Sequence, residues 1–252
     1  MACVALLAVL PASGAIAETS QLGNLRVTFA GEIEPSTLPR DGQAPVGVSF
    51  SGRISTADRT RPPQLRRITI AINRQGRLHP AGLPACRYRD IQPASSAAAL
   101  ASCRRSLVGK GHFGAAVSLP EQSPFPSSGR LLAFNGTLGG RPVLFAHVYG
   151  TRPLPQSNVL VFEIGRGSGR YGTMLTSRLP RVGADWGFVR ELSLKLRRSF
   201  AVKGRERSYL SAGCPAPDGV AGGVYPFAKA TFSFADGRDL EATLTRTCRV
   251  SR

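Results

Sequence analysis

The stretch from residue 131 to 178 decides the fold: it contains LLAFN (131–135), VLFAHVY (143–149) and VLVFEI (159–164), followed by YGTMLTSR (171–178). The first three segments are apolar at both odd and even positions. This pattern predicts strands that are covered on both faces, whereas a strand that alternates has one face in water. Turn-forming glycines and prolines separate the segments. None of the gaps can hold a crossover helix, so we expect these strands to pair antiparallel at the centre of the fold.

Further strands are predicted on both sides of this centre, and most of them alternate between apolar and polar residues. They are expected at residues 25–29, 46–54, 68–72, 189–198, 207–212, 227–235 and 238–248. Asp236-Gly237 suits a two-residue hairpin turn between the last two. Roughly ten short strands with turns about every 8–12 residues predict a mostly β fold, an antiparallel β-sandwich of Ig-like or jelly-roll-like type, with a barrel as the alternative.

One helix is predicted, over residues 92–107. Ser95 or Ser96 can cap its N-terminus by accepting from free backbone N–H groups. The alanine-rich centre has a high helix propensity, and Gly109 is expected to end the helix. Cys103 lies on the apolar face, so a disulfide from it would tether the helix to the rest of the fold.

The N-terminus has the features of a secretory leader. Residues 4–10 form a short apolar core, and small residues precede Glu18 in the pattern of a cleavage site. The apolar run is too short to span a bilayer, and no later segment is long and apolar enough to do so. A buried N-terminal strand or helix is the alternative. We expect a signal peptide over residues 1–17 and a single β-sandwich domain over residues 18–252, with a helical insertion at about 92–108.

Four cysteines remain after this leader: Cys86, Cys103, Cys214 and Cys248. An even number in an exported chain predicts two disulfides, and four cysteines allow three pairings. We favour Cys86–Cys103 and Cys214–Cys248, because the predicted C-terminal hairpin places Cys248 opposite Tyr225, at the end of the hairpin where Cys214 leaves its strand. The chain has no Cys-x-x-Cys pair, which argues against a zinc site. No metal and no cofactor are expected.

The charge of the chain is strongly positive. Thirty-three Lys and Arg residues face fifteen Asp and Glu residues, which gives a formal net charge of +18. Such a surface favours anionic partners, for example an anionic cell-wall or extracellular polymer. Nucleic acid is an unexpected partner, because the basic clusters lack interleaved stacking aromatics and the leader directs the chain out of the cell. A solvated basic surface without a partner is the alternative.

The common catalytic motifs are missing. Residues 109–114 match Gly-x-Gly-x-x-Gly, but they follow a predicted helix and lead into a strand, which is the reverse of a dinucleotide site. We read these glycines as a helix cap and a turn. A serine-nucleophile elbow, Gly-x-Ser-x-Gly, does not occur either.

Four residues are candidates for a ligand site: His147, Glu163, Asp185 and Trp186. His147 lies in a central strand, where it is either a general base or a buried histidine bonded to the backbone. Glu163 is a charge inside a central strand, and a structural ion pair with Arg166 or His147 is its alternative role. Asp185 beside Trp186 has the carboxylate-and-aromatic pattern of a sugar site.

Two functions follow from these observations. The first is a non-catalytic, binding or structural protein, secreted or held in the cell envelope, whose basic surface suits anionic polymers. The alternative is a secreted carbohydrate-active or other hydrolase on a β-sandwich scaffold. Two of the four candidate residues converging in an open cleft would favour the hydrolase.

Overall fold

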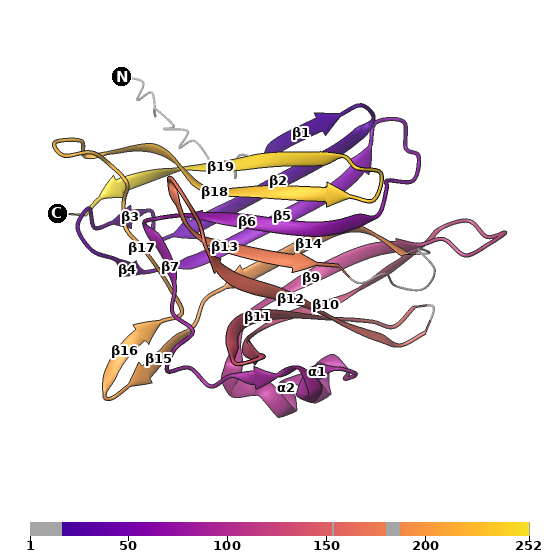
Figure 1. Cartoon of the computed structure of the whole chain (residues 1–252), viewed down its shortest axis with the longest axis horizontal. Helices are drawn as coiled ribbons and strands as arrows, with labels where there is room; N and C mark the ends of the chain where they lie inside the picture. Colours follow the sequence, from indigo (N-terminus) through magenta and orange to yellow (C-terminus); the bar gives the residue numbers. More distant parts are fainter. Residues whose placement is uncertain (1–16, 153, 180–186, 252) are drawn as a thin grey trace, which may run out of the picture.

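A computed structural model describes residues 17–152, 154–179 and 187–251 of the chain. Most of these residues are in strands, and the main strands join one fourteen-stranded sheet (Figure 1). Its strands are β1 (Glu18–Leu22), β2 (Leu25–Glu34), β3 (Thr37–Leu38), β5 (Gly47–Thr56), β6 (Leu65–Asn73), β8 (Cys86–Arg87), β9 (Leu107–Val117), β10 (Phe125–Leu138), β11 (Arg141–Gly150), β12 (Gln156–Arg166), β13 (Tyr171–Arg178), β14 (Gly187–Leu196), β18 (Gly222–Phe234) and β19 (Asp239–Val250).

The remaining elements are short. Two small sheets have the orders β4-β17-β7 and β15-β16. Their strands are β4 (Ala44–Pro45), β7 (Gly76–Leu78), β15 (Ser199–Val202), β16 (Arg205–Ser208) and β17 (Leu210–Ala212). The helices are α1 (Tyr88–Ile91), α2 (Ser96–Cys103) and the 3₁₀ turn η1 (Arg104–Ser106). No helix in the described part of the chain is long and apolar enough to cross a membrane.

The large sheet runs in the order β1-β2-β5-β14-β9-β10-β11-β12-β13-β6-β18-β19-β3, with β8 added beside β10. Consecutive central strands pair antiparallel, as the short gaps between them predict. The two-residue strands β3 and β8 pair parallel, so the sheet is mixed. The Ig-like or jelly-roll-like sandwich is not confirmed, because the main strands form one continuous sheet and not two.

The sheet curls so that its two ends approach each other. The rings of Phe29 in β2 and Phe232 in β18 meet edge-on at 6.1 Å, although many strands separate them in the sheet order. On the same side, Thr245 of β19 lies 3.5 Å from the carboxylate of Glu18 in β1. The curled sheet therefore has an inner face, which carries the main apolar core, and an outer face.

Two of the three central segments, in β10 and β11, are buried on both faces as their sequence predicts, whereas β12 is mostly half-buried. In β10, residues 131–136 are all buried. Leu131 and Ala133 belong to the inner core, whereas Leu132 and Phe134 belong to a second core beneath the helices. Figure 1 shows α1 and α2 against the outer side of β10 and β11. Both cores meet at these strands, which explains why apolar residues occupy both their odd and their even positions.

The helix is shorter than predicted, but its cap is confirmed. The side chain of Ser95 accepts a hydrogen bond from the backbone N–H of Ala98, and α2 ends at Cys103. Gly109 does not end the helix, because η1 does so and Gly109 already lies inside β9. A Cβ on Gly111 of β9 would lie 1.9 Å from the backbone oxygen of Ser193, so the interpretation of these glycines as a cap and turn was wrong. They allow β14 to approach β9 closely.

Both predicted disulfides are confirmed. Cys86 is bonded to Cys103, with their Cα atoms 5.5 Å apart, and Cys214 is bonded to Cys248, with their Cα atoms 5.8 Å apart. The first tethers α2 to β8 at the outer face. The second ties the loop before β18 to β19 at one end of the curled sheet.

The C-terminal hairpin turns through three residues, not the predicted two. The N–H of Phe234 donates to the oxygen of Arg238 at 2.9 Å, which leaves residues 235–237 as the loop. Gly237 has φ +85°, as expected for a type I turn followed by a left-handed residue. Asp236-Gly237 does lie in the turn, as predicted, but the turn has three residues and not two.

The register of this hairpin differs from the prediction in consequence. Cys248 lies opposite Gly223, and the predicted partner Tyr225 lies opposite Arg246. One position of the difference comes from the three-residue turn, and the other comes from a bulge after Pro226. The disulfide still forms because its partner cysteine is in a loop, which does not depend on the register of the hairpin.

Candidate ligand-binding cavity

A cavity of about 550 Å³ lies inside the curled sheet. Small-molecule sites have volumes of about 300–1,000 Å³, so its size is that of a ligand site. Its walls come from the inner faces of strands on both sides of the curl, including β2, β5, β6, β9, β12 and β18. The loops that follow β5, β9 and β11 gather at the right-hand end of the molecule in Figure 1. The small sheet β4-β17-β7 lies at the left-hand end.

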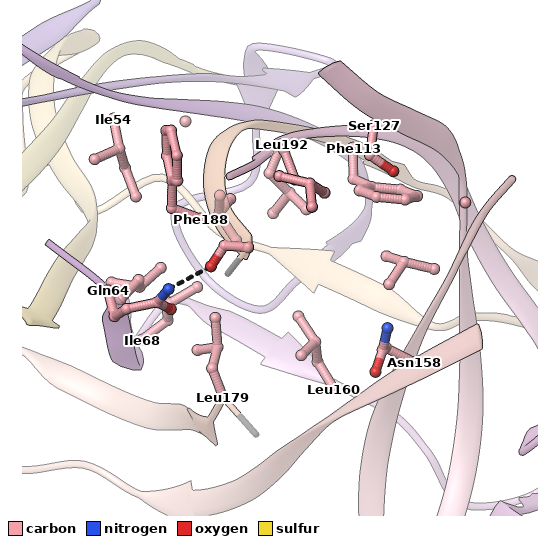
Figure 2. Close-up of a pocket in the computed structure, with 18 of the residues that line it drawn as sticks. Ile54, Gln64, Ile68, Phe113, Ser127, Asn158, Leu160, Leu179, Phe188 and Leu192 are labelled. Atoms are coloured by element: carbon pink, nitrogen blue, oxygen red, sulfur yellow. Dashed lines mark hydrogen bonds between the residues drawn. The ribbon is translucent and has the colours of Figure 1, made fainter. Parts of the chain in front are cut away.

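The walls of the cavity are strongly apolar. Six of the twelve phenylalanines of the chain line it, together with many aliphatic side chains (Figure 2). The six rings are those of Phe29, Phe50, Phe113, Phe162, Phe188 and Phe232. The alternation of β2 and β5 predicted an apolar inward face, and the curl of the sheet turns several such faces toward one space.

Exposed residues mark the mouth of the cavity. Arg152, Leu154 and Gln156 line the cavity and are also exposed to solvent, and we call these three residues the mouth. Leu154 is 74 % exposed. At the far wall, Phe29 and Phe232 are buried. The cavity therefore runs from a solvated rim into the apolar interior.

The polar groups of the cavity gather on one side, where β10, β11 and β12 are neighbours. Ser127 of β10 donates to the backbone oxygen of Arg152 at 2.8 Å, which fixes the chain at the mouth. Asn158 of β12 lies opposite Val148 of β11, two positions inside Gln156. Figure 2 shows Ser127 and Asn158 on one side of the cavity. On the other side, the amide of Gln64 is held by a hydrogen bond to the backbone oxygen of Gly187.

Gly52 leaves open space in the wall. It lies inside β5, it lines the cavity, and a Cβ added to it would meet only one atom within 4 Å, the backbone oxygen of Thr28 at 4.0 Å. A glycine inside a strand weakens the strand and is often found where a ligand comes close to the backbone. Nothing on the protein side explains the missing side chain, since the neighbouring atoms leave room for one.

His147 is sealed beneath the helical cover and does not reach the cavity. Its ring is fully buried, and its Nε2 lies 2.9 Å from the backbone oxygen of Ala94. A carbonyl oxygen accepts, so Nε2 carries the proton and donates. Burial lowers the pKa of His147 below its usual value, against a smaller opposing effect of the hydrogen bond to Ala94. The ring is therefore a neutral anchor between the sheet and the chain that connects α1 to α2.

Glu163 lies apart from His147. Glu163 pairs with Val143 and His147 pairs with Val159, so both side chains share the outer face but are four positions apart along the strands, about 13 Å. Glu163 is exposed. The other two candidates, Asp185 and Trp186, lie outside the described residues. The two candidates that the structure describes, His147 and Glu163, therefore do not converge in a cleft.

Sequence reasoning missed a contact between a serine and a histidine at the left-hand end. The Nε2 of His79 lies 2.7 Å from Oγ of Ser211, and that hydroxyl donates to Oε1 of Gln43 at 2.7 Å. Since a hydroxyl has one proton, Nε2 of His79 must donate to Ser211. An activated serine needs the opposite direction, from the hydroxyl to the imidazole. Ser211 is also buried in β17, so this chain of bonds joins the short strands and has no nucleophile.

A basic area lies on the outer face of the sheet, behind the cavity wall. Lys110 of β9 is directly opposite Lys195 of β14, and His112 is directly opposite Arg130 of β10. All four side chains are exposed. We call these four residues the basic face. The carboxylate of Glu34 forms a long ion pair with this face, with its Oε2 3.8 Å from Nζ of Lys195.

In the part of the chain that the structure describes, no three His, Cys, Asp or Glu side chains gather as ligands of a metal ion would. None of the described residues that line the cavity is of these types. Comparisons with protein-family models, with curated proteins and with solved structures found no match for this chain.

Proposed function

We propose that the chain is a non-catalytic binding protein that holds an apolar small molecule inside its curled sheet. The observation that carries this proposal is the cavity of about 550 Å³ with six phenylalanine rings in its walls. Apolar walls of this extent are unfavourable against water, and they contribute to binding when an apolar ligand covers them. The polar groups are few, and most of them lie on the side of β10 to β12, opposite Gln64; a few placed polar groups in an apolar wall are usual in a small-molecule site.

We further propose that the protein works outside the cytoplasm. Two disulfides support this location, because disulfides persist in oxidising compartments. An exported protein that shields an apolar molecule from water would allow that molecule to cross an aqueous space. Its surface charge would then face the envelope or the medium.

The test of the binding function fills the cavity. Leucine at position 52 would project into the cavity without a backbone clash. We expect the neutral fluorescent probe N-phenyl-1-naphthylamine to bind the native protein and become brighter, and the Gly52→Leu variant to lose at least tenfold in affinity. The matched control is Gly165→Leu in β12, where a new Cβ would also meet a single atom, at 3.9 Å.

Gly165 is exposed, so its variant should bind the probe as the native protein does. Circular dichroism and thermal unfolding of both variants establish that they fold. Probe binding that is absent in the native protein, or that is equal in the two variants, would refute the proposal.

The basic face supports a second candidate function, the binding of an anionic polymer. Like charges directly opposite each other on a sheet are destabilising, so the Lys110 and Lys195 pair is more favourable when an anion lies between them. A polymer of anionic groups could extend from this pair toward Arg130. This function does not exclude the first, because the basic face and the cavity are on opposite faces of the sheet.

Salt and substitution together test the second candidate. We expect the native protein to bind dextran sulfate at low ionic strength and to release it as salt rises. The double variant Lys110→Gln/Lys195→Gln should weaken binding more than Lys203→Gln/Arg249→Gln, which removes the same charge elsewhere on the surface. Equal loss in the two double variants would mean that net charge, and not the basic face, binds the polymer.

A further inference from the structure

The geometry points to an anionic single-chain amphiphile as the ligand, with its tail in the cavity and its head group at Arg152. This inference rests on the proposed binding function and adds the chemical class of the ligand. It follows from the cluster of polar groups beside Arg152, from the kind of charge at the mouth, and from the apolar wall around Phe29 and Phe232.

Among the described side chains that line the cavity, the charge has one sign. Arg152 is the one ionisable residue of this set, and the set contains no Asp or Glu. No described carboxylate forms an ion pair with Arg152. A cationic head group would meet Arg152 without a counter-charge, whereas a carboxylate or phosphate would gain charge-assisted hydrogen bonds.

The polar groups beside Arg152 complete a small head-group site. Gln156 and Asn158 are successive residues on the inner side of β12, and neither carboxamide is hydrogen-bonded to another described residue. Their N–H₂ groups can donate to an anion beside the guanidinium. Ser127 cannot serve the ligand as a donor, since its hydroxyl already donates to the backbone oxygen of Arg152. Its role is to position Arg152.

The apolar end lies across the cavity from these groups. Beyond Asn158, the inward residues of β12 are Leu160 and Phe162, and the wall continues to Phe29 and Phe232 on the opposite side of the curl. A molecule with one polar end and one apolar chain matches this order. A molecule with polar groups at both ends would place one of them beside Phe29 and Phe232, in a part of the described wall that is apolar.

The test compares ligands that share a tail and differ in the head. Dodecanoate, dodecyl phosphate, dodecanol and dodecylamine each compete with N-phenyl-1-naphthylamine for the native protein, at concentrations below those at which they aggregate. We expect the two anions to displace the probe at about tenfold lower concentration than the alcohol, the factor that a charge-assisted hydrogen bond supplies. The amine should compete least. Which of the two anions is stronger separates a carboxylate from a phosphate ligand.

A variant of Arg152 tests whether this residue causes the preference for anionic ligands. In Arg152→Gln, the preference for anions over the alcohol should fall to less than threefold. Arg166→Gln is the matched control, since Arg166 is exposed at the opposite end of the same strand, β12. It should leave the preference unchanged.

The outcomes separate this inference from the binding function. If the probe does not bind the native protein, the binding function itself fails. If the probe binds and dodecanoate and dodecanol displace it equally, the binding function stands and the anionic ligand is refuted. The anionic ligand is also refuted if Arg152→Gln and Arg166→Gln reduce the preference equally, because the effect would then come from overall charge.

Discussion

At the scale of single residues, the polar side chains near the centre of the sheet hold the structure together at the outer face. Oγ of Ser157 donates to Oε1 of Gln92 at 2.9 Å, and the Gln92 amide donates back to the backbone oxygen of Ser157 at 3.0 Å. His147 donates to Ala94 two residues further along the same connection. These hydrogen bonds satisfy polar groups of the chain between α1 and α2 that would otherwise need water. The helical cover is therefore held to the sheet by polar bonds at this connection and by apolar packing elsewhere.

The buried ring of His147 predicts a pH dependence of stability. Because burial lowers its pKa in the folded state, the folded protein binds the proton less well than the unfolded chain, where the pKa is about 6.5. The stabilisation from His147 is therefore present above pH 6.5 and is lost as the pH falls through the lowered pKa. We expect His147→Gln to reduce the free energy of unfolding at pH 7.5 by roughly 1 kcal/mol and to make its decrease toward pH 5 shallower.

Urea unfolding at pH 7.5 and pH 5.0 measures this difference. His112→Gln is the control, because it makes the same substitution at an exposed position on β9, away from the helical cover. His79 also has a lowered pKa, from burial and from the nearby Arg207 and Arg77, so part of the native slope remains in His147→Gln. A slope that is the same in His147→Gln as in the native protein would show that the ring does not stay neutral.

The sequence predicts the position of His147 better than it predicts the cavity residues. An unbroken apolar run around His147 indicates burial on both faces, and burial of a histidine between apolar neighbours leaves the backbone as its partner. Arg152, Asn158 and Gly52 carry no such signal. Each lies on a strand or loop whose inward side faces empty space only because distant strands curve around it, and local periodicity contains no information on that curvature.

At the scale of elements, the strands were predictable and their turns less so. Residues 25–29, 68–72 and 171–178 lie in strands as predicted, because period-two alternation and β-branched residues depend on the local chain. The run of glycines after α2 was ambiguous, since glycine favours helix ends and also close strand approach. The closeness of β14 decided between them, and β14 is some eighty residues away in the sequence.

The disulfide between Cys86 and Cys103 predicts a local effect. It closes a loop of 17 residues, so its removal in Cys86→Ala/Cys103→Ala should lower the free energy of unfolding by about 3 kcal/mol. The loss should also free the helical cover, because α2 is tethered there and buries only Ala99 and Cys103. Hydrogen exchange should accelerate over residues 88–106 and stay slow in β10.

The same variant separates the two cores. Phe134 and Phe145 face the helical cover, whereas the cavity is lined from the inner face. The double variant should therefore bind N-phenyl-1-naphthylamine with native affinity in conditions where it remains folded. If the folded double variant no longer binds the probe, the outer core must support the cavity wall. That result would contradict the separation of the two faces.

At the scale of the whole molecule, the order of the strands explains what the sequence could not predict. β14 lies between β5 and β9, and β6 lies between β13 and β18, so long-range pairings close the curl. A sandwich and a curled sheet share the same alternating strands, and only these pairings distinguish them. The cavity is a property of the closed curl, and no single segment of the chain encodes it.

The last prediction concerns how much a bound ligand raises the unfolding temperature of the intact protein. A ligand that binds only the folded state stabilises it by about 2.7 kcal/mol at a concentration one hundred times its dissociation constant. For a chain of this size, 1 kcal/mol raises the unfolding temperature by about 2–4 °C, so saturating dodecanoate should raise it by roughly 5–10 °C.

Gly52→Leu should by itself be at least as stable as the native protein, because leucine fills space and stiffens β5. In that variant dodecanoate should no longer raise the unfolding temperature, whereas it should do so in Gly165→Leu. A rise that persists in Gly52→Leu would place the amphiphile outside the cavity, because the leucine blocks that space and leaves the rest of the surface unchanged.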